Sequence, residues 1–226
     1  MSASAQPEPT QAEPENKYPD CVFMELAGKP VESRQLATTQ VLEAVELSLN
    51  LSFNEQWEDL PAGQIRFGIR RGELQLTIKN GKVAYKDRVW NDTLNLSIPE
   101  HWQPQVADTT ETMQATTDNS PISTVRVTTK GSEDKPVWEF EEKSGDNVLQ
   151  GSIFHEKLAI VAVEWKPCTI EATFKVSDND IYVSSGEGLR SSGISRNKKA
   201  IIERLFVLRR LKSKFNPYVS RQELTI

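Results

Sequence analysis

Apolar and polar residues alternate along several stretches of the chain, and the clearest of these is Val45–Phe53. Every odd position there is apolar and every even position is polar. Successive side chains of a β-strand point to opposite faces of a sheet, so this stretch predicts a strand with one buried face and one solvated face. Further strands are predicted in 65–69, 74–78, 94–98, 124–128, 137–140, 151–154, 158–165, 170–176 and 181–183.

Turn residues separate most of these stretches, which indicates antiparallel hairpins. The strongest turn signal is Asn80-Gly81, because both residues tolerate the positive φ that a type I′ turn needs. We therefore expect the strand at 74–78 to form a hairpin with a return strand at 83–85. The predicted fold class is all-β, with sandwich-like antiparallel sheets.

The two ends and the middle of the chain depart from this pattern. The first twenty residues contain four prolines and no apolar periodicity, which predicts a disordered acidic tail. A polar stretch near the middle predicts a linker or long loop. The predicted organisation is a tail at 1–20, a first β-rich segment at 21–99, the linker at 100–123, a second β-rich segment at 124–183, and a Gly/Ser connector with a basic helix and C-terminal tail at 184–226. The pattern leaves open whether the two β-rich segments form one domain or two.

A basic amphipathic helix is predicted from about Arg196 to Phe215, and Asn216-Pro217 ends it. One side of this helix is an apolar stripe, which we expect to pack on the protein itself. The stripe consists of Ile201, Leu205, Leu208, Leu211 and Phe215. The other side carries a mixed basic and apolar patch, the composition expected of a binding surface. This helix patch consists of Lys199, Ile202, Phe206, Arg209 and Arg210.

Charge is distributed unevenly, which the net charge of −5 conceals. From Arg196 onward the chain has nine basic residues and two glutamates, a balance of +7, so the remainder carries −12. This asymmetry indicates that the basic end meets either the protein's own acidic body or an external anion. Arg66, Arg70 and Arg71 form a second basic stripe, which either contacts phosphates or is simply solvated.

No motif for catalysis, metal binding or cofactor binding is complete. Cys21 and Cys168 lack metal-ligand spacing and are expected to be inert thiols. A glycine-rich loop before the helix has the spacing of a phosphate-binding loop, but Ile194 stands where the lysine is required. Neither His101 nor His155 is linked by sequence to a nucleophile and an acidic partner. The sequence therefore predicts no catalytic residue, no metal and no cofactor.

Five tryptophans are candidates for stacking on bases or sugars. Trp138 and Trp165 lie within predicted strands, so we expect both in the core. The other three fall near turns or loops and are the candidates for exposed positions: Trp57, Trp90 and Trp102.

The leading functional hypothesis is a non-enzymatic protein-interaction module, an adaptor or accessory subunit of a larger complex. The alternative is a nucleic-acid-binding accessory subunit that uses the basic helix and the stripe of Arg66, Arg70 and Arg71. A third is an enzyme of a class without a short local motif. No apolar run approaches the length of a membrane span and the N-terminus has no signal sequence, so we expect a cytoplasmic protein with no membrane partner.

Overall fold

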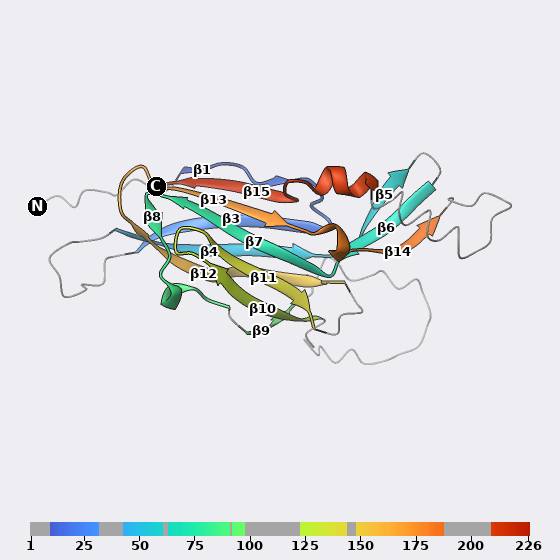
Figure 1. The fold of residues 1–226 in the computed structure, drawn as a ribbon, viewed down its shortest axis with the longest axis horizontal. Coiled ribbons are helices and arrows are strands. Elements are labelled where there is room, and N and C mark those ends of the chain that lie inside the picture. The colour runs from blue at the N-terminus through green and yellow to red at the C-terminus, as the bar shows by residue number, and fades with distance from the viewer. Residues whose placement is uncertain are drawn as a thin grey trace, which may run out of the picture.

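Strands dominate the computed structural model, which describes residues 10–31, 43–60, 63–90, 92–97, 123–143, 148–187 and 209–226. Paired strands run antiparallel. The longer strands lie along the long axis of the molecule, and a helix at 209–215 lies next to β5 (Figure 1). The predicted fold class, all-β and sandwich-like with one C-terminal helix, is confirmed.

The described strands form three sheets. The largest has the order β1-β15-β13-β7-β11-β10-β9, with β2 also pairing with β15. Its strands are β1 (Thr10–Gln11), β2 (Glu15–Asn16), β7 (Arg71–Lys79), β9 (Thr93–Leu96), β10 (Ser123–Gly131), β11 (Pro136–Glu142), β13 (Thr169–Lys175) and β15 (Ser220–Thr225). A four-stranded sheet has the order β3-β4-β12-β8 and contains β3 (Val22–Val31), β4 (Ala44–Phe53), β8 (Gly81–Lys82) and β12 (Gly151–Val163). A three-stranded sheet has the order β14-β6-β5 and contains β5 (Gln56–Leu60), β6 (Gly63–Ile69) and β14 (Ile181–Glu187).

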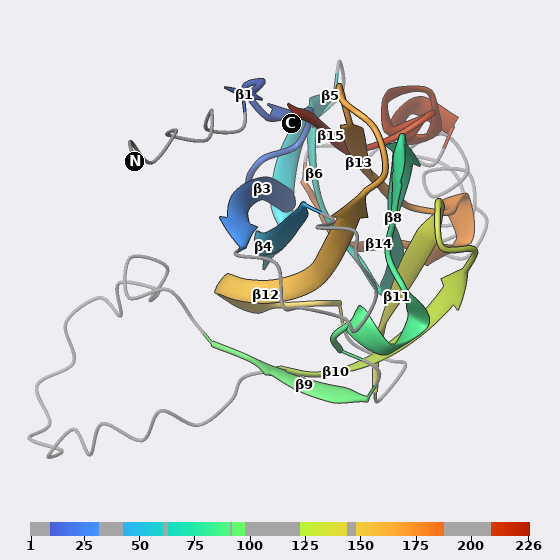
Figure 2. The same ribbon diagram turned by 90° about the vertical axis from the view of Figure 1, so that its left-hand side faces the viewer.

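The core lies between the two larger sheets, and the largest sheet curves around the four-stranded one (Figure 2). Phe53 of β4 meets the rings of Phe140 and Phe174 from the largest sheet, at centroid distances of 5.9 and 5.5 Å. The fully buried Trp138 donates its indole N–H to the carbonyl of Val89 at 2.8 Å. These apolar side chains occupy the alternating positions from which the strands were predicted.

Strands of the two β-rich segments are interleaved. In the largest sheet β7, from the first segment, lies between β13 and β11 of the second. In the four-stranded sheet β12, from the second segment, lies between β4 and β8 of the first. The described residues therefore form one interleaved body, and residues 100–122 of the predicted linker lie outside them.

The predicted disordered tail over 1–20 is wrong for its second half. β1 and β2 pair with β15, with Thr10 opposite Thr225, and Tyr18 is only 4% exposed. Hydrogen bonding to the edge of an existing strand needs no apolar periodicity, so the sequence pattern gave no sign of it. The first nine residues lie outside the described part of the chain.

Asn80-Gly81 does not form the predicted hairpin. The following strand, β8, pairs with β12, so the chain passes from the largest sheet to the four-stranded one. Asn80 has the positive φ of 62° that the turn signal implies, and its carbonyl accepts the N–H groups of Glu164 and Trp165. A Cβ at Gly81 would lie 2.9 Å from Sγ of Cys168, so glycine allows the close approach.

Tryptophan burial is only partly as predicted. Trp138 is fully buried, whereas Trp165 is 75% exposed. The prediction for Trp165 is wrong because β12 ends at Val163 and the indole belongs to the turn that follows. Of the three candidates for exposed positions, Trp57 is exposed, Trp90 is buried contrary to the prediction, and Trp102 lies outside the described residues.

Side-chain amides form hydrogen bonds with the backbone groups on the edge of β3 that faces away from β4. Asn16 accepts the N–H of Met24 through Oδ1 at 3.0 Å and donates to the Met24 carbonyl through Nδ2 at 3.3 Å. The buried Gln222 accepts the N–H of Leu26 at 2.6 Å and donates to the Ala12 carbonyl at 3.1 Å. Buried backbone groups without partners are costly, so these amides hold β3, β15 and the N-terminal segment together.

Replacing Gln222 tests this edge. Gln222→Ala leaves the buried N–H of Leu26 without its partner and is expected to lower the free energy of unfolding by about 1–3 kcal/mol. The measurement is equilibrium unfolding in guanidinium chloride. The neighbouring exposed Glu223 is the matched control, and Glu223→Gln should change stability by less than about 0.5 kcal/mol. Equal effects of the two changes would contradict this account of the edge.

Tyr18 anchors the N-terminal segment to the body. Its ring stacks on Phe215 at 5.1 Å and meets the edge of Phe67 at 5.3 Å. Its buried hydroxyl lies near the Lys214 ammonium but is not in hydrogen-bonding geometry with any described residue. The anchor is therefore the ring rather than the hydroxyl.

Two substitutions at Tyr18 separate these contributions. Tyr18→Phe keeps the ring contacts and is expected to leave thermal stability unchanged or slightly higher. Tyr18→Ala removes them and is expected to cost about 3–5 kcal/mol, the usual range for deleting a buried aromatic side chain. Thermal unfolding followed by circular dichroism measures both. A large loss in Tyr18→Phe would show that the hydroxyl holds the segment.

Candidate interaction surface

The C-terminal helix is described over 209–215, and its apolar side is buried. Leu211 is fully buried and Phe215 is 2% exposed. The ring of Phe215 meets that of Phe67 on β6 at 5.9 Å. For these two residues the predicted packing of the apolar stripe on the protein is confirmed, and the rest of the stripe lies outside the described residues.

Two lysines tie the same helix to the body through ion pairs. Lys212 pairs with Asp178 in the 3-10 turn η3 (Asp178–Asp180), and Lys214 pairs with Glu58 on β5. The hydrogen bond to Glu58 raises the pKa of Lys214. Burial raises the pKa of Tyr18, while the nearby Lys214 ammonium acts in the opposite direction. Both lysines therefore have carboxylate partners within the molecule.

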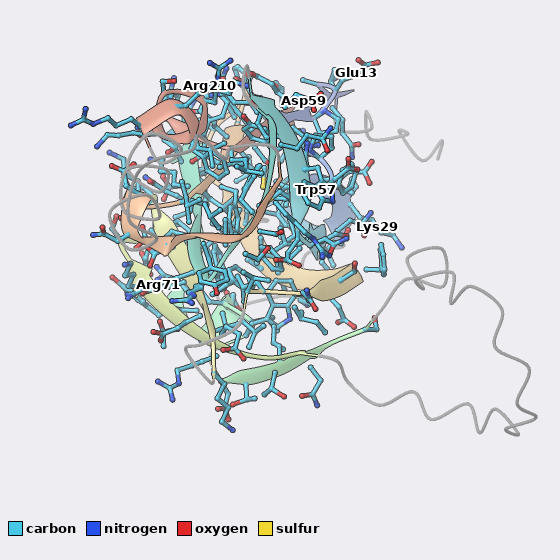
Figure 3. All side chains as sticks on the ribbon, turned by 90° about the vertical axis from the view of Figure 1, so that its right-hand side faces the viewer. Glu13, Lys29, Trp57, Asp59, Arg71 and Arg210 are labelled. Carbon is cyan, nitrogen blue, oxygen red and sulfur yellow. The ribbon has the colours of Figure 1, made fainter. Side chains whose placement is uncertain are left out.

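Arg209 and Arg210 differ from these lysines. Both are exposed, and no carboxylate of the described residues lies within ion-pair distance of either. Arg210 projects outward from the helix (Figure 3). The other predicted members of the helix patch, Lys199, Ile202 and Phe206, lie outside the described residues.

The structure separates the three arginines of the predicted stripe. Arg66 lies on β6 and pairs with Glu55 at 3.0 Å. Arg70 lies at the bend before β7, with its guanidinium 4.0 Å from the ring centre of Tyr182. Arg71 begins β7 and pairs with Glu139. Their internal partners leave less positive charge for phosphates than the sequence indicates.

The chemistry of the remaining candidates is limited. Cys21 and Cys168 are free and fully buried, and burial raises the pKa of both thiols. A thiol kept protonated is a poor nucleophile and a poor metal ligand. The described ranges hold no group of three or more His, Cys, Asp or Glu side chains placed to bind a metal. His101 lies outside these ranges, and the side chain of His155 is not described.

A shallow groove of about 360 Å³ lies where β1 and β2 meet β15. Its polar lining includes Glu13, Glu15 and Glu223, and Arg221 is already paired with Glu171 at 2.5 Å. The groove offers acidic groups at a strand edge without an arrangement that points to a reaction.

Sequence reasoning missed one cluster on the β5–β6 hairpin. Trp57 and Asp59 of β5 lie directly opposite Arg66 and Gln64 of β6. All four side chains are exposed on the same face. Alternation within 56–60 and 63–67 carried the signal, but only the strand register brings the four together.

Comparison with known proteins adds little to this geometry. No protein-family model matches the chain, and no curated protein has a significantly similar sequence. Among solved structures, one similar chain is titled "Pore forming protein"; it is 10% identical, with a TM-score of 0.34, over 80% of this chain and 93% of that one. Among the described residues, no helix is long and apolar enough to cross a membrane.

Proposed function

We propose that the protein is a non-enzymatic interaction module, an adaptor or accessory subunit, whose C-terminal helix binds an acidic surface of a partner protein. One observation carries the proposal. The two lysines of the helix are neutralised by Asp178 and Glu58, whereas Arg209 and Arg210 are exposed without a carboxylate partner among the described residues.

The anchoring of the helix supports this function. Leu211 and Phe215 are buried in the body, so the two arginines project from a held element rather than from a free tail. Holding a binding group in position reduces the entropy lost on association. A guanidinium presents a planar set of donors that matches a carboxylate in two-point hydrogen bonding. The helix patch is proposed to extend to Lys199, Ile202 and Phe206, which add apolar contact area.

Nucleic-acid binding is the alternative function. It needs several unpaired cations along one surface. The ion pairs of Arg66 and Arg71 weaken this alternative. A cytoplasmic location is part of the proposal, supported by two free buried thiols of the kind that reducing compartments maintain.

Charge reversal on the helix tests the proposal. The wild type and Arg209→Glu/Arg210→Glu are each used as bait in native extract, with and without nuclease and at two salt concentrations. The double variant is expected to lose a defined set of proteins that the wild type retains after nuclease treatment. The affinity for a purified member of this set should fall at least about tenfold.

Lys86→Glu/Lys135→Glu provides the matched control, with the same charge change at two exposed lysines away from the helix. It should retain the full set, and both double variants should unfold at the wild-type temperature. Recovery of the same proteins by all three baits would contradict the proposal. Loss of every retained protein on nuclease treatment would favour the nucleic-acid alternative instead.

A further inference from the structure

The outer face of the β5–β6 hairpin carries four exposed side chains in two facing pairs. Trp57 lies opposite Arg66, and Asp59 lies opposite Gln64. We call these four residues the hairpin array. Trp57 is 43% exposed, and Figure 3 shows Trp57 and Asp59 along the same strand. The facing residues are close neighbours because opposite side chains on paired strands are about 5 Å apart at Cβ.

Hydrogen bonds within the protein already hold the polar members of the array. Nε2 of Gln64 donates to Oδ1 of Asp59 at 2.7 Å. The Arg66 guanidinium pairs with Glu55 at 3.0 Å. Asp59 keeps its second oxygen, Gln64 its carbonyl, and Arg66 further N–H groups for a ligand. Donors and acceptors are thus set around an exposed indole before any ligand arrives.

The array is separate from the helix proposed as the protein-binding surface. Side chains alternate along a strand, so Glu58 and Phe67 lie on the opposite face of the hairpin from Trp57 and Arg66. Glu58 pairs with Lys214, and Phe67 packs on Phe215 of the helix. The helix therefore covers the inner face of the hairpin, and the array faces outward.

We propose that the hairpin array binds a neutral polysaccharide chain. A sugar ring has an apolar C–H face that packs on an indole and hydroxyl groups at its rim that both donate and accept hydrogen bonds. The array offers both features side by side. Asp59 accepts hydroxyl protons, while Gln64 and Arg66 complete the polar rim. Because the array lies on an open sheet face rather than in a deep pocket, it fits an extended chain better than a single small molecule.

The charge and the apolar content of the array favour this ligand over other macromolecules. Glu55 neutralises Arg66, so the array does not attract a nucleic acid or another polyanion. Trp57 is the one large apolar side chain exposed on the described parts of the three-stranded sheet, β5, β6 and β14. Protein-binding sites and lipid-binding faces present larger apolar areas. A neutral polyol needs only the one ring and its polar neighbours.

Co-sedimentation with insoluble cellulose, chitin and starch tests the proposal on the full chain. The wild type is expected to bind at least one of these polysaccharides. Trp57→Ala and Asp59→Ala should each weaken that binding, Trp57→Ala by about tenfold or more, since stacking on the indole supplies most of the contact. Circular dichroism and thermal unfolding confirm that each variant is folded.

Two controls make the result specific. Trp165→Ala removes another exposed indole, which lies in the turn after β12 at the other end of the molecule, and should bind as the wild type does. Arg209→Glu/Arg210→Glu should also leave polysaccharide binding unchanged, which separates this site from the helix surface. The proposal is overturned if the wild type binds none of the three polysaccharides, or if Trp57→Ala binds as strongly as the wild type. Trp57-dependent binding to phosphatidylcholine vesicles without polysaccharide binding would assign the array to a lipid surface and also overturn it.

Discussion

Backbone groups along one edge of β3 face away from β4 and require partners inside the protein. Asn16 and Gln222 supply them from segments at opposite ends of the sequence, and Ser220 donates a further bond to the carbonyl of Val22 at 3.2 Å. β15 consequently serves two sheets: its backbone pairs with β13, β1 and β2, and its buried side chains complete β3. The four-stranded sheet and the largest sheet depend on this shared strand because buried polar groups left unpaired are costly.

The helix is fixed by the same framework. It ends just before β15, where the N–H of Val219 donates to the carbonyl of Phe174 at 2.8 Å. On its buried side Phe215 joins Tyr18 of the N-terminal segment to Phe67 of the hairpin. Three elements distant in sequence therefore meet at one aromatic cluster. This cluster fixes the helix, and with it the position of the exposed arginines.

Local pattern was enough to predict the parts of the fold whose side chains face a core. The alternation over 45–53 identified β4, and the helical spacing of Leu211 and Phe215 identified the buried side of the helix. Alternation says which face is buried but not which strand lies alongside, so the interleaving of the two segments was not predictable. The exposed position of Trp165 has the same origin, since it depends on where β12 ends rather than on the residue type.

Features made by polar contacts between distant segments could not be predicted from the sequence. β1 and β2 contain no apolar residues, and only their hydrogen bonding to the edge of β15 makes them strands. The sequence indicated that Asn80 tolerates a positive φ. That Asn80 joins two sheets depends on its hydrogen bonds to the turn at 164–167, which the sequence does not reveal. The hairpin array combines four ordinary surface residues, and it becomes a site only through the register of β5 on β6. The helix patch was predicted from composition, and the structure describes only its last two members.

The pairing of β1 and β2 with β15 joins residues separated by about two hundred positions. On the ribosome the N-terminal segment emerges well before its partner strand, so this part of the structure forms only after the residues between them have been made. Contacts this distant in sequence also slow folding, because a long loop must close before they form. Until then the edge of β3 lacks both Gln222 and the strand that carries it. During synthesis the nascent chain therefore presents an unprotected strand edge, the kind of surface on which chaperones act and aggregation begins.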